Sequence, residues 1–262
     1  MRLGGLALAV VLLAGTLAAA PTAAGAARPG DLRITAHRGA PAGGVTENTV
    51  PAMRRAVRLK ASAVETDVRM TRDGRAVLMH DPTLQRTTTC RGRVAERSLR
   101  SLRKHCRGER GGEQVPTLAD VLRLAARSRV DVLAELKGRR WSRAEVAEVV
   151  RVIDRAGMAG RVTVMAFHPE TLRRVEVRRP GLESTFLVRR WAPVADVLAY
   201  ADGVTLPPAH LTRTHVAAVR AAGKEVIARK ANNPRKWRQL KRLGVGGAIT
   251  DRVVGYRRWL HR

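Results

Sequence analysis

Short runs of apolar and β-branched residues alternate with amphipathic stretches along most of the chain, and this rhythm constrains the fold more than any other feature. Eight runs have the length and composition of strands, and a ninth, residues 76–80, resembles the return arm of a hairpin. Strands that alternate with helices predict a parallel sheet. The eight strand-like runs are residues 33–37, 63–68, 130–136, 161–167, 184–188, 202–206, 224–230 and 247–250.

Eight parallel strands in a chain of this size predict a (β/α)8 TIM barrel. The chain has 262 residues, and such barrels typically need about 250. A doubly wound open sheet is the alternative, but it usually carries a GxGxxG loop after its first strand, and HRGAPAGG lacks that spacing. We therefore expect an α/β TIM barrel with a hairpin extension and a small insertion after the second strand.

The first 26 residues resemble a secretory signal peptide. They contain one arginine, an apolar run from about Leu3 to Ala20, and small residues before a predicted cleavage after Ala26 or Ala27. An uncleaved membrane anchor is the alternative, although the run is barely long enough to span a bilayer. We expect a secreted, extracellular protein whose mature chain, residues 27–262, is a single domain.

Two cysteines, Cys90 and Cys106, are present. In an exported protein such a pair is expected to form a disulfide, worth roughly 3 kcal/mol in the chain-entropy model. Two unpaired thiols are the alternative, and the spacing does not support a zinc site.

The net charge of +28 predicts attraction to polyanions, such as an anionic wall polymer, a membrane surface or nucleic acid. The basic residues are spread rather than clustered, and aromatic residues make up 3% of the chain, which leaves few platforms for stacking bases. We therefore expect no specific nucleic-acid binding. A non-enzymatic polyanion-binding protein remains an alternative function at this point.

The stretch ETDVRMTRDGRAVLMHD, residues 65–81, predicts a hairpin that gathers charged groups. A two-residue loop, Asp73-Gly74, would place Asp67 directly opposite His80. Glu65 lies on the same face as Asp67, two residues back. A surface hairpin whose charged face is merely solvated is the alternative reading.

Polar residues also follow other strand-like runs, among them His168 after Phe167 and Asp251 after the run 247–250, and the carboxyl ends of barrel strands share one rim. Three carboxylates at this rim suit a hard divalent cation, Ca²⁺ or Mg²⁺. Two cationic side chains suit a phosphate group, and two histidines suit acid–base catalysis. Together they predict phosphodiester cleavage rather than glycoside hydrolysis. These sets are Glu65, Asp67 and Glu135; Arg38 and Lys137; and His37 and His80.

The motifs resemble those of the glycerophosphodiester phosphodiesterases. The matching segments run from about Ile34 to Asp251 and are HRGAPAGGVTENT, ETD, HDPTLQRT, LAELK and GVGGAITD. The resemblance implies a barrel related to the phosphatidylinositol-specific phospholipases C, which cleaves glycerophosphodiesters to glycerol phosphate and an alcohol. It implies that the three carboxylates bind the metal, that Arg38 and Lys137 bind the phosphate, and that the two histidines transfer protons. Glu47 matches a glutamate close to the metal site.

The sequence departs from the family pattern in places. Thr46 stands where proline is usual, and IARKAN stands where a Trp-Thr-Val-Asn motif is frequent. Arg229 and Lys230 thus replace an aromatic pocket wall with charge, and the preferred alcohol is expected to differ. Residues 83–115 correspond to a variable insertion that we expect to cover one side of the mouth.

The resemblance leaves open a lipid-cleaving relative of the phospholipase C or D kind on the same barrel. Such an enzyme needs an apolar interfacial patch, which the few aromatic residues do not suggest. We expect His37 to act as the base and His80 as the acid. We expect a monomer that acts on a small-molecule glycerophosphodiester.

Overall fold

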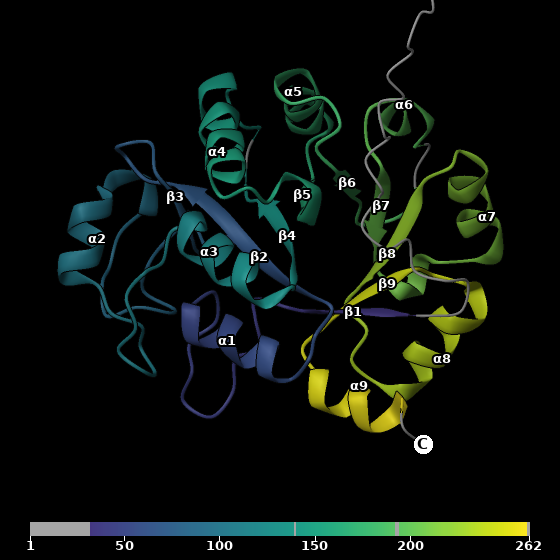
Figure 1. Ribbon diagram of the computed structural model, residues 1–262, viewed down its shortest axis with the longest axis horizontal. Coiled ribbons are helices and arrows are strands. Elements are labelled where there is room, and N and C mark those ends of the chain that lie inside the picture. Colours follow the sequence, from purple (N-terminus) through teal and green to yellow (C-terminus); the bar gives the residue numbers. More distant parts are fainter. Residues whose placement is uncertain (1–31, 139, 192–193, 261–262) are drawn as a thin grey trace, which may run out of the picture.

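Eight parallel strands close into a barrel in the part of the chain that the structure, a computed structural model, describes: residues 32–138, 140–191 and 194–260 (Figure 1). The strands are β1 (Arg33–Ala36), β2 (Ala63–Met70), β4 (Asp131–Leu136), β5 (Val162–Ala166), β6 (Ser184–Leu187), β7 (Gly203–Leu206), β8 (Glu225–Arg229) and β9 (Gly247–Thr250). Because β1 pairs with both β2 and β9, the ring is closed. This confirms the predicted TIM barrel. The predicted signal peptide, residues 1–26, lies outside the described residues.

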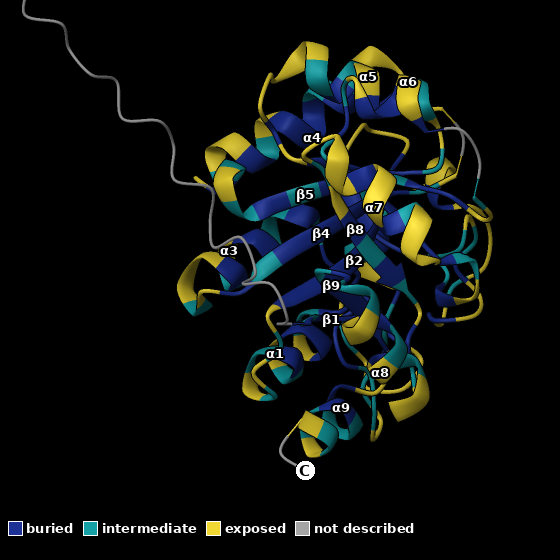
Figure 2. Cartoon of the chain, turned by 90° about the vertical axis from the view of Figure 1, so that its right-hand side faces the viewer, coloured by how far each residue is buried: buried dark blue, intermediate teal, exposed yellow. Residues whose placement is uncertain are grey.

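Helices surround the barrel, with their buried faces toward the strands and their exposed faces outward (Figures 1 and 2). They follow the amphipathic stretches between the strands, and several begin at a side-chain cap, such as the capping box of Thr117 and Asp120. None of the described helices is long and apolar enough to cross a membrane. The helices are α1 (Val50–Arg58), α2 (Leu99–His105), α3 (Leu118–Ser128), α4 (Arg143–Arg155), α5 (Pro169–Arg178), α6 (Ala195–Leu198), α7 (Arg213–Ala221), α8 (Pro234–Leu243) and α9 (Val253–Leu260).

Side chains alternate between two cores along each barrel strand. On β4, Val132 packs in the main core between strands and helices, whereas Leu133 belongs to the small core inside the barrel. Glu135 shares the face of Leu133 and therefore points inward. The same alternation on β2 directs Glu65 and Asp67 inward. The period of the strands thus carries three carboxylates into the interior of the barrel.

The hairpin loop after β2 is longer than predicted. β3 (Ala76–Leu78) returns antiparallel to β2, as expected. However, Thr71 N–H donates to Arg75 O at 3.0 Å, so the loop has three residues rather than two. Gly74, the third of them, has a φ of +67°. That left-handed conformation suits a type I turn followed by a glycine bulge.

The longer loop shifts the pairing of the hairpin by one residue. Met70 lies opposite Ala76, and Asp67 lies opposite Met79, whose N–H donates to the Asp67 carbonyl at 2.9 Å. The prediction that Asp67 faces His80 across the hairpin is therefore wrong. His80 still reaches the same cavity as Asp67, because it follows β3 at the carboxyl end of the barrel.

Residues 83–115 form a small unit beside the barrel that contains η1 (Val94–Glu96) and α2. A disulfide joins Cys90 to Cys106, whose Cα atoms lie 5.3 Å apart, and this confirms the predicted pairing. In Figure 1, α2 lies outside the ring of helices. The unit and β3 share a small core of their own, made of Val77, Met79, Leu84, Val94, Leu102, Cys106 and Val115.

This unit also contacts the loop that follows β1. Thr46 Oγ1 donates to Glu113 Oε2 at 2.9 Å, and Thr46 N–H donates to the other oxygen at 3.1 Å. Arg86 Nη2 donates to Glu47 Oε1 at 2.7 Å. The unit therefore borders the mouth of the barrel on the side of β1 and β2.

Candidate active site

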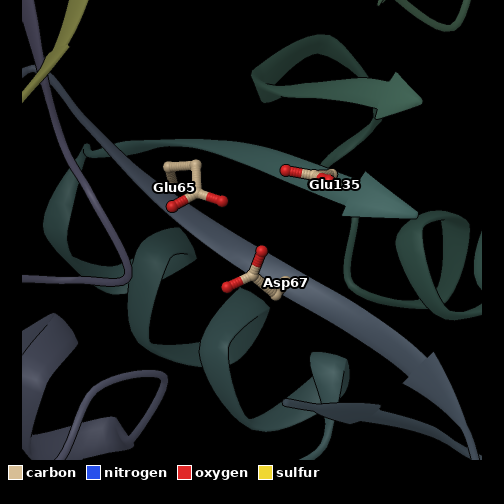
Figure 3. A group of neighbouring side chains, drawn as sticks. All are labelled: Glu65, Asp67 and Glu135. Atoms are coloured by element: carbon tan, nitrogen blue, oxygen red, sulfur yellow. The ribbon is translucent and has the colours of Figure 1, made fainter. Parts of the chain in front are cut away.

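Three buried carboxylates meet inside the carboxyl end of the barrel. Glu65 and Asp67 come from β2 and Glu135 from the adjacent β4, where Asp67 and Glu135 are register partners (Figure 3). One ligand oxygen from each lies within 4.8 Å of the others. Their exposed fractions are 2%, 1% and 7%, so burial is nearly complete. The structure thus brings together the three predicted metal-binding residues, called the acidic trio below.

The acidic trio concentrates negative charge. Burial, followed by the charges of Asp67 and Glu135, raises the pKa of Glu65 well above its usual value. Burial also raises the pKa of Asp67, but the charges of Lys137, Arg38 and His80 and the hydrogen bond from Asn48 together outweigh it, so that this pKa is lowered. An added cation would relieve the repulsion at Glu65. Since all the donors are carboxylate oxygens, the residues present fit a hard divalent cation.

The two predicted phosphate-binding cations lie against the acidic trio. Lys137 Nζ lies 2.7 Å from Glu135 Oε1 and 3.3 Å from Asp67 Oδ1. The backbone N–H of Arg38 donates to Glu65 Oε2 at 2.7 Å, and Arg38 Nε lies 3.3 Å from Asp67 Oδ2. Both cations therefore border the space in which a phosphate would meet the carboxylates.

The turn that positions Arg38 depends on a glycine. Arg38 and Gly39 both have positive φ angles, +53° and +79°. A Cβ atom at Gly39 would lie 2.7 Å from the carbonyl carbon of Ala52 and would therefore clash with the backbone of α1. Only glycine lets the chain turn this closely over α1.

His37, directly after β1, is held by a carboxylate directly after the neighbouring strand β9. Its Nδ1 lies 2.5 Å from Asp251 Oδ1, and Asn232 Nδ2 donates to the other Asp251 oxygen at 2.6 Å. The hydrogen bond with His37 lowers the pKa of Asp251, so the carboxylate stays charged and Nδ1 carries the proton. The other ring nitrogen, Nε2, can then accept a proton, and it lies 4.0 Å from Glu65 Oε2.

His80 is held in the same way by the residue that follows it. Its Nδ1 lies 2.6 Å from Asp81 Oδ1, and its carbonyl accepts hydrogen bonds from Arg69. The hydrogen bond from Arg86 lowers the pKa of Asp81 to about 2. Burial lowers the pKa of His80. Both predicted catalytic histidines thus have a carboxylate on Nδ1, which leaves Nε2 for the reaction.

Glu47 contacts two cations rather than the acidic trio. Its Oε1 lies 2.8 Å from Arg38 Nη1 and 2.7 Å from Arg86 Nη2. Asn48, which sequence reasoning missed, is buried and donates from Nδ2 to Asp67 Oδ2 at 2.8 Å. Its Oδ1 accepts from the Asp67 N–H at 3.0 Å. Its place directly after Glu47 in the HRGAPAGGVTENT motif was the available signal.

A cavity of about 200 Å³ opens at this end of the barrel, and it is lined by all seven residues predicted to bind metal or phosphate or to transfer protons. His168, also predicted near this rim, is exposed and does not line the cavity. A larger cavity of about 340 Å³ lies at the opposite end, beside Arg33, Asp131 and Glu183, and no histidine lines it. Size alone therefore does not identify the site.

Comparison with known proteins decides the family. Residues 37–254 match the Glycerophosphoryl diester phosphodiesterase family. The chain belongs to this family. A glycerophosphodiester phosphodiesterase of Caldanaerobacter subterraneus subsp. tengcongensis is 29% identical over 231 residues, which cover 83% of this chain and 93% of the relative. One of Bacillus altitudinis is 29% identical over 237 residues, which cover 84% and 94%.

A solved structure shows the same fold. It is an Oleispira antarctica phosphodiesterase in complex with the product sn-glycerol-3-phosphate, with a TM-score of 0.79 and 21% identity, covering 88% of this chain and 97% of that one. Membership of the glycerophosphoryl diester phosphodiesterase family makes this chain an enzyme of that class. Its cavity gathers the chemical groups that phosphodiester cleavage requires.

Proposed function

We propose that this enzyme is secreted and uses Ca²⁺ or Mg²⁺ and two histidines to cleave glycerophosphodiesters to glycerol phosphate and an alcohol. The observation that carries the proposal is the pair of carboxylate-bound imidazoles, His37 with Asp251 and His80 with Asp81, that flank the acidic trio. The sn-glycerol-3-phosphate bound to the Oleispira relative is consistent with this chemistry. Secretion rests on the signal-like residues 1–26.

Each histidine has a proposed part in moving protons. The attacking group is water or the hydroxyl group on the neighbouring carbon of the glycerol. His37 Nε2 accepts its proton as the new P–O bond forms. His80 Nε2 donates a proton to the oxygen of the leaving alcohol as the old P–O bond breaks. Where a glycerol hydroxyl attacks, the first product is a cyclic phosphate. Water then opens it, with the two histidines in exchanged roles.

The cations orient the phosphate. Arg38 and Lys137 border the acidic trio, and their charges offset the negative charge that grows on the phosphate oxygens. Glu65, Asp67 and Glu135 are the proposed metal ligands, and a divalent cation held there would polarise the phosphate. Glu47 fixes the far end of the Arg38 guanidinium.

The lipid-cleaving alternative finds little support at the mouth. In the described part of the chain, the exposed large hydrophobic residues are Val177 and Leu260. They lie near the carboxyl ends of α5 and α9, which point away from the mouth in a βα barrel. A non-enzymatic polyanion-binding role does not suit a member of an enzyme family. The charge of +28 still supports an anionic wall polymer or membrane surface as a partner of the monomer.

The test is an assay of His37→Ala and His80→Ala on glycerophosphocholine, glycerophosphoethanolamine and glycerophosphoinositol, with Ca²⁺ or Mg²⁺. We expect turnover to fall by roughly 10²- to 10⁴-fold in each variant, with the fold retained by circular dichroism. His168→Ala, an exposed histidine on the same rim, is the matched control and should keep wild-type turnover. Turnover near wild type in either test variant contradicts the acid–base roles. Full activity of EDTA-treated protein contradicts the metal.

A further inference from the structure

The later strands contribute two cations to the wall of the cavity, beside the apolar residues Met165, Leu187 and Ile249. Arg229, the last residue of β8, and Lys230 line the cavity. The guanidinium carbon of Arg229 lies 4.7 Å from the centre of the Phe167 ring, and that of Arg189 lies 4.8 Å from it. Phe167 follows β5, and β5 is not a neighbour of β8 in the sheet. Arg229 therefore reaches across the mouth, where the aromatic ring holds both cations in place.

These two arginines differ from the others at the mouth in what they bind. Arg38 and Arg86 both donate to Glu47. Within the described residues, neither Arg189 nor Arg229 forms an ion pair or hydrogen bond with a carboxylate, and the Nε atom of Arg229 is buried without an acceptor. The half-buried guanidinium of Arg229 keeps its charge, since arginine does not deprotonate in proteins. A buried donor without an acceptor is costly, unless a ligand supplies the acceptor.

We propose that Arg189 and Arg229 bind a second phosphate of the substrate, so that the preferred substrates are glycerophosphodiesters that carry another phosphate, such as oligomers of glycerol phosphate. This inference rests on the proposed function. A guanidinium group binds a phosphate through paired hydrogen bonds. In a glycerol phosphate oligomer every unit is itself a glycerophosphodiester, and a three-carbon unit separates neighbouring phosphates. Arg229 lines the same cavity as the acidic trio, and Arg189 contacts the same aromatic ring as Arg229. One phosphate can therefore lie at the acidic trio while its neighbour lies at the two arginines.

The same charges disfavour other alcohol groups. A choline or ethanolamine group would bring a positive charge beside Arg229 and Lys230, which line the cavity, and near Arg189, which lies beside them. Like charges in a partly desolvated cavity repel. An uncharged alcohol offers the Arg229 Nε atom only a hydroxyl oxygen, which is a weaker acceptor for a guanidinium group than a phosphate oxygen. A second phosphate satisfies both requirements.

The experiment compares three substrates with the full-length enzyme. Bis(glycerophospho)glycerol carries a second phosphate, glycerophosphoglycerol has the same alcohol without it, and glycerophosphocholine carries a cation. We expect kcat/KM for the first to exceed that for the second by about tenfold per scissile bond, since hydrogen bonds to charged groups have about that effect. Glycerophosphocholine should be the poorest substrate.

Variants assign the preference to the two arginines. In Arg189→Gln and in Arg189→Gln/Arg229→Gln, the ratio of kcat/KM for bis(glycerophospho)glycerol over glycerophosphoglycerol should fall toward one, mainly through KM. Arg229→Trp should lower the same ratio. It should also raise kcat/KM for glycerophosphocholine relative to that for bis(glycerophospho)glycerol, because a tryptophan face attracts quaternary ammonium groups. Arg54→Gln/Arg238→Gln removes equal charge at exposed positions outside the cavity and should keep the wild-type ratio.

Three outcomes overturn the inference. They are a wild-type ratio near one, a ratio that Arg189→Gln and the double variant leave unchanged, and an equal fall in the Arg54→Gln/Arg238→Gln control. In each of these cases cleavage of glycerophosphoglycerol would still support the proposed function. If the wild type cleaves none of the three substrates, the proposed function fails instead. Because Arg189 is exposed, its single variant tests the inference even where the double variant does not fold.

Discussion

Charged residues on two sides of the barrel mouth have different kinds of partner. On the first, called the paired side, each charged group has a protein partner. This side comprises His37, Arg38, Glu47, His80, Asp81, Arg86 and Asp251. On the second, called the open side, Arg189 and Arg229 contact an aromatic ring and no carboxylate among the described residues. The open side comprises Phe167, Arg189, Arg229 and Lys230.

The difference shows how one cavity can use separate residues for bond cleavage and for substrate selectivity. Groups on the paired side are fixed before substrate binds, so they are ready to act on any phosphodiester. Glu47, for example, bridges Arg38 to Arg86, which belongs to the unit of residues 83–115. Groups on the open side keep hydrogen-bonding capacity for the substrate. We therefore expect changes on the paired side to affect all substrates alike and changes on the open side to affect selectivity.

The largest expected effect comes from the acidic trio, beside the paired side. Glu135→Gln keeps the shape of the side chain, removes one of three carboxylates and weakens the 2.7 Å contact with Lys137. We expect kcat/KM to fall about a thousandfold on every substrate, or about 4 kcal/mol of transition-state stabilisation. Calorimetry should show weaker Ca²⁺ or Mg²⁺ binding. A loss restricted to substrates with a second phosphate would contradict the separation of the two sides.

The next effect concerns the carboxylates behind the histidines. Asp251→Asn removes the charge that fixes the His37 tautomer and keeps a similar shape. We expect kcat to fall about 100-fold with little change in KM, because the residue orients the base without contacting substrate. Steady-state kinetics on glycerophosphocholine and bis(glycerophospho)glycerol should show equal losses.

The matched control for this variant is Asp196→Asn. Asp196 is exposed on α6, distant in the chain from the histidines, and its variant should keep wild-type kcat. Equal losses in both variants would show that the effect of Asp251→Asn is not specific to His37.

The sequence predicted the fold and the meeting of the acidic trio at one rim because both follow from regular patterns. The eight strands were predicted from their β-branched runs, and the shared face of Glu65 and Asp67 was predicted from the two-residue period of strands. The position of these residues at one rim follows from the closure of the barrel. No side-chain packing had to be known for these predictions.

What could not be predicted depends on single backbone angles and on contacts between distant segments. The register of the hairpin changed by one residue because Gly74 takes a positive φ in a three-residue loop. The role of Asn48 depends on a positive φ of 56° that turns its amide toward Asp67. The contact of Arg229 with Phe167 spans two strands that are not neighbours. Local sequence contains no signal for such a contact.

A smaller effect is expected from the disulfide behind the paired side. Cys90→Ser/Cys106→Ser opens a bridge between residues 16 apart, which costs about 3 kcal/mol in the chain-entropy model. We expect a lower urea midpoint and a partial loss of kcat on all substrates, because Arg86 belongs to the same unit. Dithiothreitol should lower the midpoint of the wild type and leave that of the variant unchanged. A change in selectivity instead would link this unit to the open side.

The smallest effect is a pH dependence from Asp81. Its pKa is lowered to about 2 in the folded protein, chiefly by the hydrogen bond from Arg86, from an ordinary value of 3.8. An acid with a lowered pKa stabilises the fold at pH values above its ordinary pKa. This stabilisation is lost as the pH falls from the ordinary pKa toward the pKa in the folded protein. At about pH 6 we expect Asp81→Asn to lower the free energy of unfolding by about 1 kcal/mol, after allowance for solvent screening. Urea unfolding of both proteins should show this gap closing as the pH falls from 3.8 toward 2. A gap that stays constant with pH would mean that the charge of Asp81 does not stabilise the paired side, and that shape alone holds His80 in place.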